Sequence, residues 1–147
     1  MLGQLMEQEL GGAQPQLTIV DMEASIEHMS RGTVRHTDTM LIVTEPYYRS
    51  LETTGRTATL AQGLGIKQIY VVANKVRSPQ DEEAIRRYCD ERGLEIIAVL
   101  PFDDDVRQSD NAGTPILDRK PLPAYVGLVE QLAEKLLKEP AVASQAS

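Results

Sequence analysis

Cysteine, tryptophan and phenylalanine are almost missing from this chain. Its 147 residues include one cysteine, one phenylalanine and no tryptophan. A single cysteine cannot form a disulfide within the chain, so we expect a reducing, cytoplasmic environment. One cysteine and two histidines also argue against a zinc site, which needs three or four ligands at recognisable spacings.

Long apolar runs and an excess of positive charge are absent as well. No apolar run approaches the roughly 20 residues that a membrane-spanning helix needs. Residues 1–10 contain two glutamates and no lysine or arginine, so we expect no signal peptide. The 22 acidic and 15 basic residues give a net charge of −7. This balance argues against nucleic acid and against a membrane surface as partners.

The remaining pattern is that of a single layered domain over residues 1–138, with a disordered tail over 139–147. Apolar stretches predict strands at 17–21, 39–44, 68–73 and 95–100. Amphipathic stretches predict helices at 1–10, 23–30, 50–64, from 79 to just before Gly93, and 123–138, with a loop or short helix at 103–110. Apolar strands joined by such helices predict an α/β fold, a mostly parallel sheet with helices on both faces.

Two of the expected helices have a clear inner face. The residues expected to point inward are Leu51, Thr54, Ala58, Ala61 and Leu64 in the first, and Tyr125, Leu128, Val129, Leu132, Leu136 and Leu137 in the last.

Ligands of parallel α/β sheets bind at the carboxyl ends of the strands, so the loops after residues 21, 44, 73 and 100 are the informative ones. Asp21 ends the first expected strand, where a nucleotide-binding protein can place a carboxylate for Mg²⁺. Glu23 follows in the same loop and could orient water or a partner group. The alternative is that Asp21 only caps the next helix.

The later loops contain groups suited to a purine base. Asn74 can present an amide and a carbonyl to the edge of adenine, and the stem of Lys75 can cover the base plane. Pro101 and Phe102 can form an apolar wall. The aspartates that begin at Asp103 suggest either a metal site or the solvated start of a helix.

In this order, these segments resemble one family. They are Asp21-Met22-Glu23-Ala24-Ser25-Ile26-Glu27-His28, Arg31-Gly32-Thr33, Glu45-Pro46 with Ser50, Asn74-Lys75, and Pro101-Phe102-Asp103. Together they look like the nickel-insertion accessory ATPases that mature carbon monoxide dehydrogenase, within the ParA, MinD and nitrogenase-iron-protein group of dimeric P-loop ATPases.

The resemblance implies a role for each matching residue. Asp21 would coordinate Mg²⁺, and the loop of Glu23 would sense the γ-phosphate of ATP. Asn74 and Lys75 would read the adenine. Residues 101–103, which are Pro101, Phe102 and Asp103, would close the far side of the base pocket.

Three departures from the family pattern are visible. The family begins with a strand and a glycine-rich loop that ends in Gly-Lys-Thr or Gly-Lys-Ser, and this chain contains no such loop. The family's Cys-x-Cys metal pair is also missing, and Ser25 stands where glycine is usual. We therefore expect a P-loop NTPase-like fold that is truncated at its N-terminus.

The expected function is that of a partial ATP-binding domain, which helps insert nickel into carbon monoxide dehydrogenase but does not hydrolyse ATP alone. Its partners would be a second copy or a complementing subunit, and a metalloenzyme client. The alternatives are a non-catalytic interaction or regulatory module, and a gene fragment without an independent role. The nucleotide interpretation requires Asp21 to lie on the rim shared by the loops after residues 73 and 100.

Overall fold

The computed structural model describes residues 18–22 and 37–138. The helices expected at 1–10 and 23–30, the residue Glu23 and the tail expected at 139–147 lie outside these residues.

The core of the fold is a parallel sheet, as the sequence predicts. Strands β1 (Thr39–Thr44), β2 (Gln68–Val76) and β3 (Glu95–Pro101) lie in the order β1-β2-β3, and both neighbouring pairs are parallel. The central strand β2 is the most deeply buried, and Val71 and Ala73 have no exposed surface. An uninterrupted apolar run is expected for a strand that is covered on both faces.

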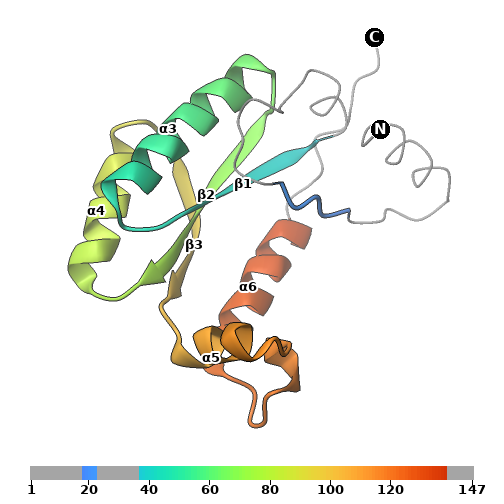
Figure 1. Ribbon diagram of the computed structural model, residues 1–147. Helices are drawn as coiled ribbons and strands as arrows, with labels where there is room; N and C mark the ends of the chain where they lie inside the picture. The colour runs from blue at the N-terminus through green and yellow to red at the C-terminus, as the bar shows by residue number, and fades with distance from the viewer. Residues whose placement is uncertain (1–17, 23–36, 139–147) are drawn as a thin grey trace, which may run out of the picture.

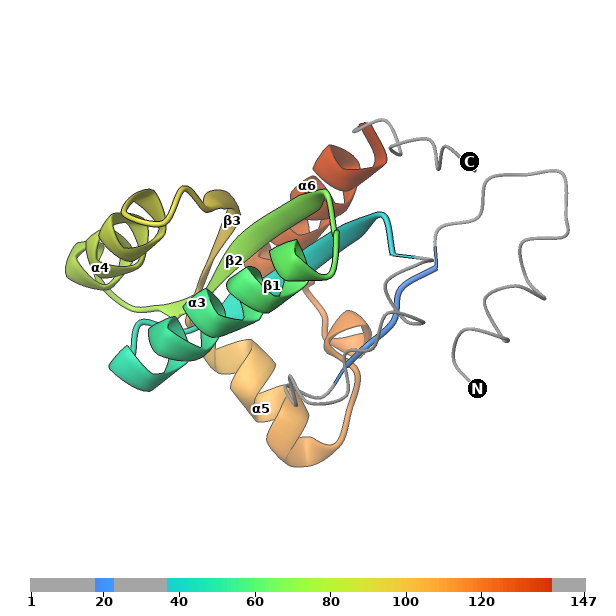
Figure 2. The same ribbon diagram turned by 90° about the horizontal axis from the view of Figure 1, so that it is seen from above.

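Helices α3 (Tyr48–Gly63) and α4 (Pro79–Asp90) cover one face of this sheet (Figures 1 and 2). Their inner residues join the strands in one core, which includes Ile42, Leu51, Ala58, Val71, Ile85 and Cys89. The Ser78 hydroxyl accepts a hydrogen bond from the backbone N–H of Asp81, at 3.2 Å, and caps α4 ahead of the proline at its first position.

Helix α6 (Ala124–Lys138) covers the opposite face, over β2 and β3. Its inward residues are Tyr125, Leu128, Leu132 and Leu136. The inward positions predicted for Val129 and Leu137 are wrong, because these side chains are 41 % and 66 % exposed. Only a narrow stripe of α6 packs against the sheet. Val126 is the buried residue of this helix, and it follows Tyr125 of the stripe in the chain.

The same face of β1 is not covered by α6. Leu41 and Val43 point to this side and are 38 % and 59 % exposed. The strand predicted at 17–21 is not formed over Thr18–Met22, which has no regular structure. This segment is blue in Figures 1 and 2. A strand needs a neighbour for its ladder of hydrogen bonds, and no described strand pairs with this segment or with the outer edge of β1.

The end of β2 and the segment that follows β3 also differ from the prediction. Strand β2 was expected to end at residue 73, but it continues to Val76, which pairs with Pro101. The segment expected as a loop or short helix forms helix α5 (Asp104–Ala112), followed by the short 3-10 helix η2 (Ile116–Asp118). Both differences lie next to the expected base-binding loops.

Candidate functional site

The end of β2 contains the most unusual backbone in the described residues. The pairing of β2 with β3 shifts register between Ala73 and Val76, so Asn74 and Lys75 form a bulge. Lys75 has a φ of 55°, and it is the one non-glycine residue with positive φ in the described part of the chain. Bulges are frequent next to active sites, where they redirect a side chain. A left-handed residue with a side chain also marks a site whose surroundings impose that conformation.

A salt bridge ties Lys75 to the loop after β1. Its Nζ lies 2.6 Å from Oε1 of Glu45. This hydrogen bond, followed by the coulombic attraction of the same carboxylate, raises the pKa of Lys75. The Lys75 side chain is 52 % exposed, so the pair adds little stability. Its effect is to hold the lysine stem across the carboxyl ends of β1 and β2.

Hydroxyl groups of half-buried and buried residues fix the position of Glu45. The Glu45 N–H donates to Oγ of Ser50 at 2.9 Å, and this Oγ shares a second hydrogen bond of 3.1 Å with the buried Thr44. Thr54, one turn along α3, donates to the backbone oxygen of Ser50 at 2.9 Å. Ser50 belongs to the family resemblance, and its structural task is to join the end of β1 to the first turn of α3.

The loops after β2 and β3 meet at Phe102. Its backbone N–H donates to the Val76 carbonyl at 2.9 Å. The guanidinium of Arg77 lies over the Phe102 ring, with 3.7 Å between Cζ and the ring centroid. One face of the ring expected to wall the purine is therefore covered by Arg77. Sequence reasoning missed this contact, although Arg77 and Phe102 both lie within four residues of the expected strand ends at 73 and 100.

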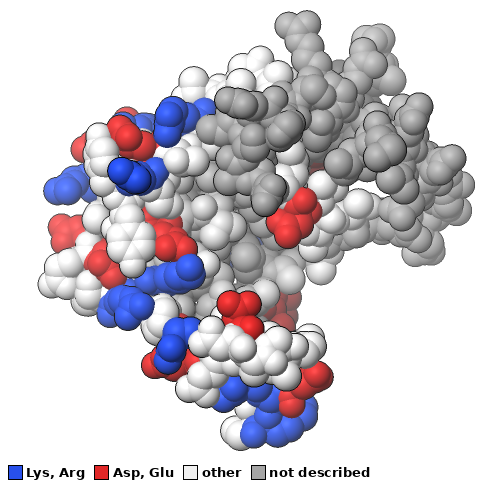
Figure 3. All heavy atoms as spheres, in the orientation of Figure 1, with Lys and Arg blue, Asp and Glu red and all other residues white. Residues whose placement is uncertain are grey.

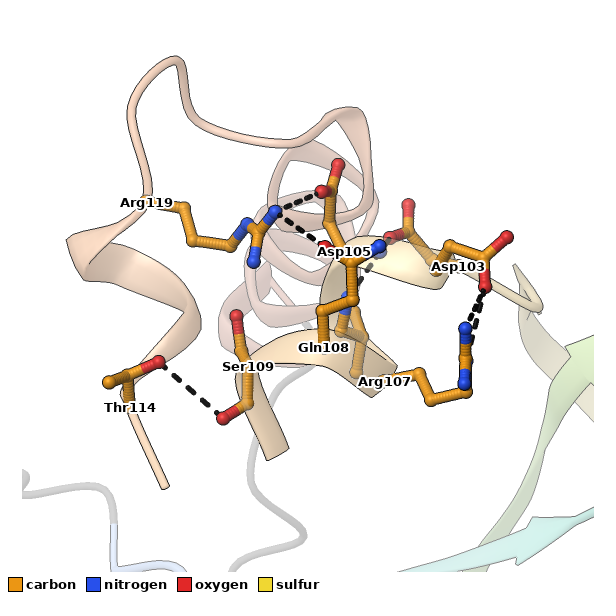
Figure 4. A network of polar contacts seen from close by, with 9 residues as sticks. Asp103, Asp105, Arg107, Gln108, Ser109, Thr114 and Arg119 are labelled. Carbon is orange, nitrogen blue, oxygen red and sulfur yellow. Dashed lines mark hydrogen bonds and ion pairs between the residues drawn. The ribbon is translucent and has the colours of Figure 1, made fainter. Parts of the chain in front are cut away.

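Asp103 begins helix α5. Its Oδ1 accepts hydrogen bonds from the backbone N–H groups of Asp105, at 2.8 Å, and Val106, at 3.1 Å. Two further aspartates pair with arginines: Asp104 with Arg107 at 3.0 Å, and Asp105 with Arg119 (Figure 4). The acidic run is thus a capped helix start, and residues 18–22 and 37–138 contain no group of three potential metal ligands.

Tyr125 from α6 completes the rim. Burial raises the pKa of its hydroxyl, the charge of Asp103 raises it further, and the charge of Lys75 opposes this. The rim therefore combines Glu45, Lys75, Phe102, Asp103 and Tyr125, which come from four different segments of the chain.

Asp21 is not brought together with this rim. It is exposed in the irregular segment Thr18–Met22. The role expected for Asp21 stays a prediction, and Glu23 lies outside the described residues. What remains of that interpretation rests on the loops after β1, β2 and β3.

The surface has no dominant charge of one sign in the view of Figure 3. Basic and acidic side chains alternate over α3, α4 and the α5 region. In the described part of the chain, no helix is both long and apolar enough to cross a bilayer.

Comparisons with known proteins agree with this fold. No family model matches the chain. It is 36 % identical over 126 residues to an uncharacterized ATP-binding protein of Methanocaldococcus jannaschii, an alignment that covers 84 % of this chain and 49 % of that protein. It is 41 % identical over 103 residues to the carbon monoxide dehydrogenase accessory protein CooC of Rhodospirillum rubrum, which covers 70 % of this chain and 38 % of CooC.

The fold has a solved counterpart in the cell division protein MinD of Aquifex aeolicus. The two superpose with a TM-score of 0.63 at 22 % identity, over 79 % of this chain and 50 % of MinD. The chain thus spans half or less of the length of these proteins. The parallel sheet, the order of the rim segments and these similarities lead to one conclusion: the chain belongs to the ParA/MinD-like family of P-loop ATPases and is of the CooC type.

Proposed function

We propose that this chain supplies the base-binding side of an ATP site in a CooC-type maturation ATPase. One observation carries the proposal: Lys75 is held in a left-handed conformation and bridged to Glu45 at the strand ends, and the next residue, Val76, accepts the backbone hydrogen bond of Phe102. The names of the relatives support the choice of ATP, since one is an ATP-binding protein.

Each rim residue has a distinct role in this proposal. The Asn74 amide reads the edge of adenine, and the Lys75 stem covers part of the base plane. Pro101 and Phe102 form the far wall. Asp103 fixes this wall through its hydrogen bonds to the first turn of α5, rather than through a bond of its own to the base.

Binding of the ATP phosphates and their Mg²⁺ needs groups other than those of the rim. Charge-assisted hydrogen bonds to phosphate contribute roughly 1.5–3 kcal/mol each, so the lack of two or three lowers ATP affinity by about four decades. This chain has no Gly-Lys-Thr or Gly-Lys-Ser loop to make them. Among residues 18–22 and 37–138, no three His, Cys, Asp or Glu side chains gather at one point, and the role of Asp21 toward Mg²⁺ stays a prediction.

A titration of the whole chain with adenosine, guanosine and ATP, followed by amide chemical shifts, tests the proposal. We expect adenosine to bind in the millimolar range, guanosine to bind more weakly, and ATP to bind no more than a few-fold tighter than adenosine. Asn74→Ala should weaken adenosine binding. Equal binding of adenosine and guanosine would contradict base recognition at Asn74, and absence of any binding would end the proposal.

A turnover assay with Mg²⁺-ATP tests the catalytic part. We expect no hydrolysis by this chain alone, because the phosphate loop is not in it. Rates similar to those of a full-length relative would overturn this expectation.

A second role, as a complementing subunit, is favoured by the uncovered apolar face of β1, formed by Leu41 and Val43. In this proposal the chain assembles in the cytoplasm, with a second copy or a partner, and serves nickel insertion into a metalloenzyme, as the name of the CooC relative suggests. Mixing it with the N-terminal half of a family member should restore tight ATP binding. Separate elution of the two chains on size exclusion would argue against this role.

A further inference from the structure

Arg77 is held by a stacking contact, whereas several other arginines of the described chain are held by ion pairs. Arg86, Arg107 and Arg119 each pair with a carboxylate. The guanidinium of Arg77 has no carboxylate partner among residues 18–22 and 37–138, although Asp81 is close. The Asp81 carboxylate instead accepts a hydrogen bond of 2.9 Å from the Arg77 backbone N–H. The loop is therefore fixed by its backbone, and the guanidinium is left to lie on Phe102.

A guanidinium in this position has one face covered and one face free. It is planar and weakly hydrated, and it stacks well on aromatic rings. Its inner face lies on Phe102, while the Arg77 side chain as a whole is exposed. A base that approaches Phe102 from this side meets the plane of Arg77 before it meets the ring.

We propose that Arg77 is the stacking surface for the adenine base, with Phe102 as the support behind it. This inference rests on the proposed function. It changes the role of Phe102, which would support the Arg77 side chain instead of contacting the base directly. Arginine planes and aromatic rings are both established platforms for nucleobases. The same loop connects Arg77 to the Lys75 bulge, so a single segment would supply a stacking plane and an edge-reading amide.

The experiment compares four forms of the whole chain by adenosine titration, with amide chemical shifts as the readout. Adenosine is the probe because it has no phosphate and so does not respond to a change in surface charge as an anion does. We expect Arg77→Ala to weaken binding by about ten-fold, the scale of one lost stacking contact. Arg77→Lys should weaken it similarly, because lysine keeps the charge but loses the plane.

Arg86→Ala is the matched control. It removes the same charge from a salt-bridged, exposed position on α4 and should leave adenosine affinity unchanged. Far-ultraviolet circular dichroism of each variant checks that the fold is retained.

The outcomes separate this inference from the function on which it rests. If the unmodified chain binds no adenosine, both fail. If it binds, and Arg77→Ala behaves as Arg86→Ala does, the base site stands and the role of Arg77 is wrong. Tighter binding by Arg77→Ala would show that the guanidinium blocks the ring. Full affinity in Arg77→Lys would show that the plane is not what the base contacts.

Discussion

Lys75 occupies a backbone conformation that residues with a side chain rarely adopt. In the left-handed region the Cβ atom approaches the following carbonyl, at a cost of about 1–2 kcal/mol. The bridge to Glu45 is half exposed and does not offset this by itself. The bulge in the pairing of β2 with β3 therefore imposes the conformation on Lys75.

Two replacements of Lys75 distinguish the backbone strain at this position from the role of its side chain in adenosine binding. Lys75→Gly and Lys75→Ala both lose the bridge, but only glycine relieves the strain. We expect Lys75→Gly to exceed Lys75→Ala in free energy of unfolding by about 1 kcal/mol, measured with urea. Adenosine binding should weaken in both. Equal stability of the two variants would mean that the bulge relaxes around residue 75.

At the scale of elements, the contact between α3 and α4 depends on a glycine. A Cβ added at Gly55 would lie 2.5 Å from the hydroxyl oxygen of Tyr88 and 3.3 Å from Nε of Arg92. Tyr88 is itself covered by Arg92, whose Cζ lies 3.6 Å from the ring centroid. The tyrosine hydroxyl can therefore yield only if this stacked pair moves.

We expect Gly55→Ala to lower the free energy of unfolding by about 1–2 kcal/mol, despite the better helix propensity of alanine. In a Tyr88→Phe background, which removes the hydroxyl, the same change should be neutral or stabilising. Gly63→Ala is the control on the same helix, because nothing lies within 4 Å of its added Cβ. Additive effects of the two changes in thermal unfolding would contradict a contact between them.

Helix α5 depends on its N-cap residue in a similar way. Asp103→Ala removes the acceptor of two backbone N–H groups and should destabilise the protein by about 1 kcal/mol. Asp103→Asn should retain most of this stability, because the side-chain oxygen remains. Urea unfolding measures both. If Asp103→Asn binds adenosine normally, the carboxylate charge has no direct role at the base.

The elements show how far local sequence information extends. Strand β1 and the start of α4 at residue 79 follow from residues adjacent in the chain, and both are confirmed. The strand expected at 17–21 is wrong over Thr18–Met22, because a strand also needs a neighbour in space. The Lys75 bulge and the Arg77–Phe102 stack arise from the way β2 and β3 align, which no local pattern encodes.

At the scale of the whole molecule, the single cysteine reports on the integrity of the core. Cys89 has no exposed surface and packs between α4 and the sheet. Burial raises the pKa of its thiol, and the neighbouring Asp90 raises it further. At any pH the folded protein therefore holds less reactive thiolate than free cysteine does.

We expect the Cys89 thiol to react with a chromogenic disulfide reagent only when the core opens. At pH 8 the folded chain should react far more slowly than the chain in concentrated guanidinium chloride. For each destabilising variant, the logarithm of the reaction rate should rise in proportion to the loss of stability. Rapid and complete labelling of the folded chain would show that α4 separates from the sheet readily.

The hydrogen bonds of Asp103 give the rim a mechanical link to a distant loop. The Asp103 carboxylate, which follows Phe102 in the chain, accepts hydrogen bonds from the first turn of α5. Asp105 in that turn forms an ion pair with Arg119, fourteen positions further along the chain. We therefore expect a displacement of Phe102 to shift the first turn of α5 as well. The segment around Arg119 would then signal occupancy of the strand ends to whatever surface lies against it.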